Sequence, residues 1–135
     1  MNKIAKLIPL FLAAAISLTG CVGVPEGFDE TEVKEKAKEV VELLNNRDFH
    51  AVTAMTREDL QELLPADELE KALIQQLSDL GAFVEYKSVM AAGTKDQKTQ
   101  EDYAVVVVTA VYQNGNATYT ISVDRDLAVV GLYMK

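Results

Sequence analysis

The fold is decided by residues 103–124, YAVVVVTAVYQNGNATYTISVD. Two runs rich in β-branched and aromatic residues, Tyr103–Tyr112 and Ala117–Val123, lie on either side of Asn114-Gly115. Asn-Gly is the strongest short hairpin signal, because both residues tolerate the positive φ of a tight two-residue turn. The stretch therefore predicts two antiparallel strands joined at Asn114-Gly115.

The predicted register of this hairpin separates two faces. With Asn114-Gly115 as the loop, Tyr112 pairs with Ala117, and Ala110 pairs with Tyr119. One face is then apolar and the other mixes valine with threonine and serine, which is the pattern of a sheet with a one-sided core. The mixed face would hold Val105, Val107, Thr109, Val111, Thr118, Thr120 and Ser122.

Two further strands extend the hairpin into a four-stranded antiparallel meander. Phe83–Met90 has a period of two residues and precedes a polar loop, Ala91–Glu101. Leu127–Met134 follows a predicted turn at Arg125-Asp126. We expect the apolar face of the sheet to include Val106, Val108, Ala110, Tyr112, Tyr119, Ile121, Val130, Leu132 and Met134, whereas Val129 and Tyr133 would point outward.

The residues before the sheet have helical spacing. Asp29 followed by Glu32 is typical of a capping box and begins a helix that ends at Asn45-Asn46. A short helical segment with apolar residues at Phe49, Val52 and Met55 follows it. These helices are expected to cover the apolar face of the sheet.

Two more helices are predicted before the first strand. Thr56 with Asp59 is expected to cap a short helix, and Pro65 is expected to be the first residue of a longer helix that ends at Gly81. Helices followed by an antiparallel sheet indicate an α+β domain with the N-terminal helices packed on one sheet face.

The N-terminus has the pattern of an export signal. Lys3 and Lys6 precede an apolar run, Leu7–Leu18, which is shorter than the roughly 18–20 residues of a membrane-spanning helix. The segment closes with Leu18-Thr19-Gly20-Cys21. This ending resembles the lipobox of bacterial lipoproteins, in which the cysteine receives the lipid.

The lipoprotein resemblance implies cleavage before Cys21 and a covalent diacylglyceryl lipid on that residue, with no other cofactor. Residues 1–20 are then a lipoprotein signal peptide, residues 21–29 a tether and residues 30–135 a single α+β domain. Each buried methylene contributes about 0.8 kcal/mol, so two or more acyl chains such as palmitate give a durable anchor. We expect the protein on the extracytoplasmic face of a bacterial cell membrane.

Charge and cysteine content exclude several classes of function. The formal net charge of the whole chain is −8, and it becomes −10 after cleavage because the first twenty residues hold two basic residues and no acidic one. Nucleic acids require clustered cations, so no nucleic-acid partner is expected. Cys21 is the single cysteine of the chain, which excludes an intramolecular disulfide.

Four short motifs carry a resemblance to a known family. They are Asn46-Arg47-Asp48-Phe49, Leu80-Gly81-Ala82-Phe83, Asn114-Gly115 and Val130-Gly131-Leu132. Their order resembles that in bacterial domain-of-unknown-function family 3887, over residues 30–135. The resemblance implies the cystatin-like cone fold of nuclear transport factor two and ketosteroid isomerase. Some relatives with this fold are enzymes that use a carboxylate base and a tyrosine inside the cone.

Tyr112 and Tyr119 are the candidate pocket residues, because their hydroxyls lie on the predicted inner face. They would either orient a small ligand or serve as amphipathic core residues. His50 and Asp48 are two residues apart, so they do not face each other on a helix, and we expect a surface histidine. One histidine and no thiol beyond Cys21 predict no catalytic residue and no metal site.

The outer sheet face is a candidate partner surface, because exposed valine and threonine can hold another protein or a second copy of the domain. The alternative is that β-branched residues simply favour strands. We therefore expect a membrane-anchored lipoprotein with a non-catalytic domain that binds a ligand or protein. The alternatives are a small enzyme acting on an apolar molecule through Tyr112 or Tyr119, and a structural homodimer.

Overall fold

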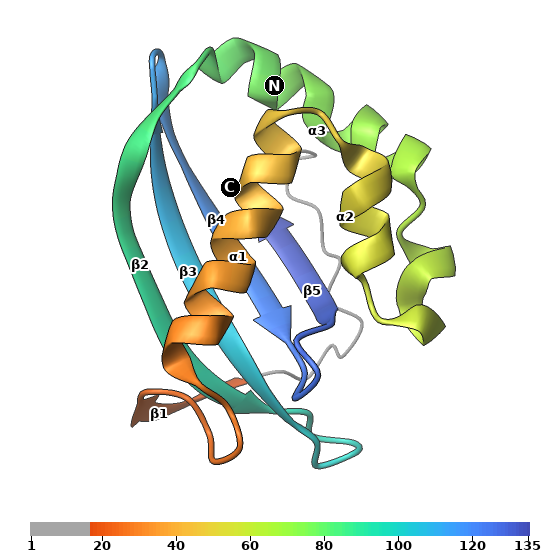
Figure 1. Ribbon diagram of the computed structural model, residues 1–135, viewed down its shortest axis with the longest axis vertical. Helices are drawn as coiled ribbons and strands as arrows, with labels where there is room; N and C mark the ends of the chain where they lie inside the picture. The colour runs from red at the N-terminus through yellow and green to blue at the C-terminus, as the bar shows by residue number, and fades with distance from the viewer. Residues whose placement is uncertain (1–16) are drawn as a thin grey trace.

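The computed structural model describes residues 17–135, which form one antiparallel sheet covered on one face by helices (Figure 1). The helical elements are α1 (Glu30–Asn45), α2 (Phe49–Met55), the 3₁₀ helix η2 (Glu58–Leu63) and α3 (Ala66–Leu80). The strands are β1 (Ser17–Val22), β2 (Phe83–Lys95), β3 (Asp102–Tyr112), β4 (Gly115–Val123) and β5 (Val129–Met134). The α+β class and the meander of β2 to β5 are confirmed.

Strand β1 was not predicted. Its backbone pairs with the C-terminal end of β2, at Ser17 with Lys95 and Val22 with Ala92, and so extends the sheet to the order β1-β2-β3-β4-β5. The first four residues of β1 belong to the predicted signal peptide, and residues 1–16 of that segment lie outside the described residues. Cleavage before Cys21 stays a prediction. No helix in the described part of the chain has the length and hydropathy needed to cross a membrane.

The helix boundaries follow local capping chemistry. The Asp29 carboxylate accepts the backbone N–H of Glu32 at 3.0 Å, which confirms the predicted start of α1. Gly81, with φ of 79°, ends α3 as predicted. The predicted cap by Thr56 is wrong. Its hydroxyl donates instead to the carbonyl of Val52, within the preceding helix α2, and η2 has no side-chain cap.

The predicted hairpin register is wrong by two residues. Tyr112 pairs with Gly115 and Ala110 pairs with Ala117, so the two loop residues are Gln113 and Asn114. Neither Asn114 nor Gly115 has a positive φ, so the turn does not use the conformation that makes Asn-Gly a hairpin signal. The two-residue shift keeps every side chain on its predicted face, because side chains alternate with a period of two.

Contacts with the end of α3 explain the observed turn. The backbone N–H groups of Gln113 and Asn114 donate to the carbonyls of Ala82 and Leu80, both at 2.9 Å. The Asn114 side chain also donates to the carbonyl of Asp79 at 3.1 Å. The α3–β2 junction thus holds residues 113 and 114 as the turn, which a purely local signal does not reveal.

Strand β2 is longer than predicted, because it continues through the predicted loop as far as Lys95. Ala91, Ala92 and Gly93 are weak strand formers, but they pair with Val106, Val105 and Ala104 of β3. The true connection is short and is closed by Asp96, whose N–H donates to the carbonyl of Glu101 at 2.9 Å.

A β-bulge in β5 reverses the positions predicted for the side chains of Val129 and Val130. Ser122 pairs with Gly131, but the next pair is Val123 with Val129, which leaves Val130 as the extra residue. Val129 therefore belongs to the inner core, and Val130 lies outside that cluster. The predicted faces of these two valines are wrong because a strict alternation does not continue through a bulge.

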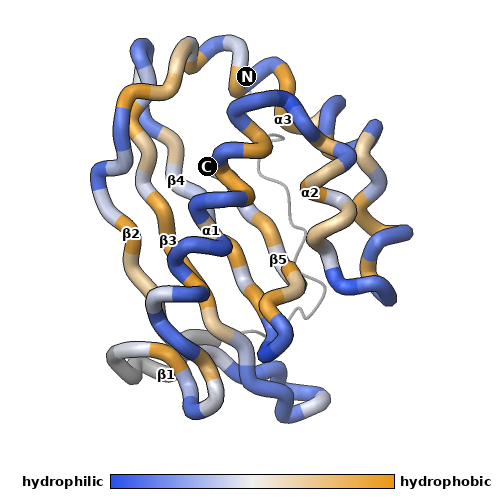
Figure 2. The backbone as a smooth tube through the Cα atoms, viewed as in Figure 1, coloured by the Kyte–Doolittle hydropathy of each residue, from blue (hydrophilic) through white to orange (hydrophobic). Residues whose placement is uncertain are grey.

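The core lies between the helices and the inner sheet face. Alternation of apolar and polar residues along α1 and the strands is visible in Figure 2. Helix α1 contributes Val33, Ala37, Val40, Val41 and Leu44, and α3 contributes Leu69, Leu73 and Leu77. They pack with the apolar residues of β3, β4 and β5, including Val106, Val108, Ile121 and Leu132.

Replacing Leu73 should test this packing. Its side chain is fully buried, so Leu73→Ala should lower the free energy of unfolding by about 2–5 kcal/mol, measured by urea denaturation. Leu63→Ala is the matched control, because Leu63 is 61% exposed, and it should change stability by less than about 0.5 kcal/mol. Equal losses in both variants would contradict the assigned core.

Candidate functional site

The structure brings the two candidate pocket residues, Tyr112 and Tyr119, together. Their hydroxyl oxygens are 2.6 Å apart, and the Tyr112 hydroxyl is also 2.6 Å from Oδ1 of Asn45 at the end of α1. Because a carbonyl oxygen accepts only, Tyr112 donates to Asn45 and Tyr119 donates to Tyr112. A directed hydrogen-bond chain thus joins β4, β3 and α1.

Both tyrosines are almost completely buried, with 4% of Tyr112 and none of Tyr119 exposed. Burial raises the pKa of both phenols, and for Tyr119 the nearby Tyr112 raises the pKa further. The pair is therefore neutral at physiological pH. Its hydroxyls are engaged with each other and with Asn45, so a ligand would have to displace one of these bonds. A ligand pocket at the pair stays a prediction.

An aromatic cluster extends from this pair to the start of β2. The Phe83 ring centroid lies 5.7 Å from that of Tyr112 and 4.9 Å from that of Tyr86. The Tyr86 hydroxyl donates to the carbonyl of Lys38 at 3.4 Å, and burial is the main cause that raises the pKa of Tyr86 to about 12. These rings connect the middle and the C-terminal end of α1 to the sheet.

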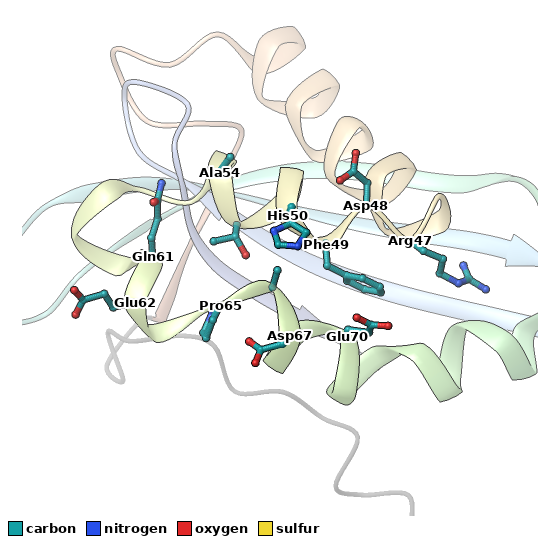
Figure 3. Close-up of a pocket in the computed structure, with 12 residues that line it drawn as sticks. Arg47, Asp48, Phe49, His50, Ala54, Gln61, Glu62, Pro65, Asp67 and Glu70 are labelled. Atoms are coloured by element: carbon teal, nitrogen blue, oxygen red, sulfur yellow. The ribbon is translucent and has the colours of Figure 1, made fainter.

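The described surface is hollowed between α2 and the segment from η2 to α3 (Figure 3). This groove has a volume of about 630 Å³. It is lined by Arg47, Asp48, Phe49, His50, Thr53, Ala54, Gln61, Glu62, Pro65, Ala66, Asp67 and Glu70. The groove was not predicted from the sequence, because its walls, residues 47–54 and 61–70, come together only in the tertiary structure.

The turn from α1 to α2 places Arg47 at one end of the groove. The N–H of Arg47 donates to the carbonyl of Leu44, and the N–H of Asp48 donates to that of Leu43, which together form a Schellman motif. Arg47 occupies the left-handed position of this motif, with φ of 62°, where glycine is usual. An arginine there costs about 1 kcal/mol in backbone strain.

Asp48 and Phe49 complete the turn. Asp48 caps α2 by accepting the backbone N–H of Ala51 at 3.2 Å, and the Phe49 ring is buried in the core. Each residue of the motif Asn46-Arg47-Asp48-Phe49 therefore has a structural role. Asn46 ends α1, Arg47 forms the left-handed turn, Asp48 begins α2 and Phe49 is a core residue. The Arg47 side chain has an internal contact as well, with a carbonyl at the end of α1, and a charged residue at this left-handed position is the sequence signal for this end of the groove.

The groove carries charges of both signs. Arg47 and Asp48 come from the α1–α2 side together with His50, whereas Asp67 and Glu70 project from the first turns of α3 (Figure 3). His50 is exposed, as expected of a surface histidine. The Arg47 guanidinium donates to the carbonyl of Asn45 at 2.9 Å. Within the described chain, no three or more His, Cys, Asp or Glu side chains are grouped to hold a metal ion.

A second polar cluster surrounds Arg57, between α2 and η2. Arg57 bridges to Asp59 at 2.9 Å, to Glu101 at 3.1 Å and to the buried Asp124 at 3.5 Å. These ion pairs connect the α2–η2 junction to the loops before β3 and after β4. Because the cluster joins three separate segments of the chain, we assign it a structural role.

The outer sheet face is less exposed than the sequence suggested. Val105 and Ser122 are buried, and Val107, Thr109 and Val111 are half-buried. Met90 of β2 is a large apolar residue of the sheet that is 65% exposed. A partner or homodimer contact through this face stays a prediction.

The direction of the tyrosine chain can be tested by two hydroxyl deletions. Tyr112→Phe leaves the buried Tyr119 hydroxyl without its acceptor and should cost about 1–3 kcal/mol of unfolding free energy. Tyr119→Phe keeps the bond from Tyr112 to Asn45 and should cost about 0.5–1.5 kcal/mol. Urea denaturation of both variants measures the difference, and a larger loss for Tyr119→Phe would reverse the assigned direction.

Comparison with known proteins agrees with the fold. A protein from Ruminococcus gnavus ATCC 29149, whose structure was determined by NMR, superposes with a TM-score of 0.73 and 27% sequence identity, covering 87% of this chain and 96% of that one. No curated protein matches the chain. Residues 37–132, most of the chain, match the family described as "Protein of unknown function (DUF3887)". The chain therefore belongs to the DUF3887 family.

Proposed function

We propose that this protein is a lipid-anchored extracytoplasmic binding protein. Cys21 carries the covalent lipid, and the groove between α2 and α3 is the ligand site of a non-catalytic domain. The groove, which is lined by charges of both signs, is the observation that carries the binding role. The motif Leu18-Thr19-Gly20-Cys21 supports the anchor.

The anchor is supported by the composition of the N-terminus. Lys3 and Lys6 followed by the apolar run Leu7–Leu18 form an export signal too short to span a membrane as a helix. Cys21 is the one cysteine of the chain and stands nine residues before the start of α1. A thiol at this place suits attachment of a lipid.

The binding role is supported by the strained arginine at the groove. Backbone strain at a residue that glycine would relieve is typical of functional sites, because selection keeps a costly side chain there for another reason. Arg47 supplies a planar guanidinium, which is suited to bidentate contact with a carboxylate. Ala54 and Pro65 add apolar surface to the groove.

The cation at Arg47 and the carboxylates of α3 favour a zwitterionic ligand such as a short peptide. Arg47 would bind its carboxylate, and Asp67 and Glu70 would bind its ammonium group. A volume of about 630 Å³ is within the range of small-molecule sites in proteins.

The anchor can be tested in a bacterial host that lipidates proteins. The wild-type chain should incorporate labelled palmitate and sediment with membranes, whereas Cys21→Ser should lose the label. Val22→Ser is the matched control and should keep it. Labelling of Cys21→Ser, or no labelling of the wild type, would contradict the proposed anchor.

The ligand site can be tested by NMR titration with the dipeptide Ala-Lys, with free and with blocked termini. The free dipeptide should shift the amide signals of Arg47, Asp67 and Glu70, and the blocked one should bind at least about tenfold more weakly. Arg47→Gly should weaken binding by a similar factor and raise the unfolding free energy by about 1 kcal/mol.

Lys71→Ala is the control for this titration. It removes one positive charge from the exposed surface of α3, outside the groove lining, and should leave the affinity unchanged. Shifts located away from the groove, or an affinity that does not depend on Arg47, would contradict the assigned site.

A further inference from the structure

The segment predicted as a tether lies against the sheet. An ideal Cβ placed on Gly93 of β2 would come within 2.8 Å of Cγ of Pro25, so Pro25 packs closely on the strand where residue 93 has no side chain. Val24 and Phe28 pack against the hydrophobic core. The N–H of Phe28 donates to the carbonyl of Pro25 at 3.2 Å, which closes these residues into a turn.

Arg125, in the β4–β5 loop, contacts this turn through its side chain. Its guanidinium donates to the carbonyl of Glu26 at 2.9 Å and to the Asp102 carboxylate at 3.2 Å, and it lies 5.4 Å from the centroid of the Phe28 ring. Gly27 has φ of 94°, and a Cβ there would meet Nε of Arg125 at 2.7 Å. Residues 24–28, which we name the strap, thus fit between β2 and Arg125.

The strap leaves little free chain next to the lipid site. The four residue steps from Cys21 to Pro25 span at most about 14 Å when extended. Asp29, directly after the strap, caps α1 and so ties the other end to the helix layer. A lipid on Cys21 must therefore lie near the end of the sheet where Gly93 and Arg125 contact the strap.

We propose that the strap fixes the orientation of the anchored domain on the phospholipid surface. The loops at 96–101 and 124–128 then face the bilayer, whereas the β3–β4 turn at Gln113-Asn114 points away from it. These features lie at opposite ends of the domain (Figure 1). The C-terminal end of α1, where Arg47 borders the groove, also lies at the far end and is open to a ligand arriving from solvent. This inference rests on the proposed lipid anchor at Cys21.

Docking of the strap can be tested without a membrane, by chymotrypsin cleavage of the Phe28–Asp29 bond, followed by mass spectrometry on the full chain. Arg125→Ala and Gly27→Val each disrupt the contact between Arg125 and the strap. Each variant should speed this cleavage by roughly tenfold or more. Lys98→Ala removes an exposed cation from the 96–101 loop and should leave the rate unchanged. Cleavage of the wild type as fast as that of both variants would overturn the docked strap.

Orientation is tested with the lipidated protein in nanodiscs that contain lipids with a paramagnetic headgroup. Amide signals of residues 97–100 and 125–127 should broaden strongly, and those of Gln113 and Asn114 should not. Arg125→Ala should make the broadening even over the domain. If the wild-type amide signals broaden evenly over the domain although the strap is cleaved slowly, the proposed orientation is overturned. Failure to acquire a lipid at Cys21 would instead overturn the anchor and would not change the cleavage result.

Discussion

Burial of one face of the β3–β4 hairpin is the constraint on which the structure depends. The inner face of the two strands is apolar from Val106 to Tyr112 and from Ala117 to Val123, so a second layer must cover it. Helices α1 and α3 provide that layer with apolar stripes at helical spacing. The buried chain from Tyr119 through Tyr112 to Asn45 then fixes where the end of α1 lies over the strands.

Helix α1 connects the two regions to which we assign a role. Its N-terminus follows the strap, and its C-terminus ends in the left-handed turn at Arg47. Sixteen residues of α-helix extend about 24 Å, so the lipid end and the ligand end are held apart by one rigid element. Both ends rely on an arginine that no apolar pattern requires, Arg125 at the strap and Arg47 at the groove.

Several features were predictable because they depend on neighbours in sequence. The Asp29 cap, the stop at Gly81 and the alternation in β3 and β4 each follow from contacts a few residues apart. The groove was not predictable, because Arg47 and Glu70 line the same groove only when α2 packs against α3. The strap was missed for the same reason, since the partner of Glu26 is 99 residues away.

The α+β class, the meander and the faces of β3 and β4 follow from the sequence alone, because a period of two or 3.6 residues is a property of neighbouring residues. The sequence also determined the lipobox resemblance at Cys21. Tertiary structure alone decided the turn at Gln113-Asn114 and the exchange of Val129 with Val130. At both places, hydrogen bonds from distant backbone groups stabilise the observed arrangement: Leu80 and Ala82 accept from the turn, and Arg57 donates to the carbonyl of Val129.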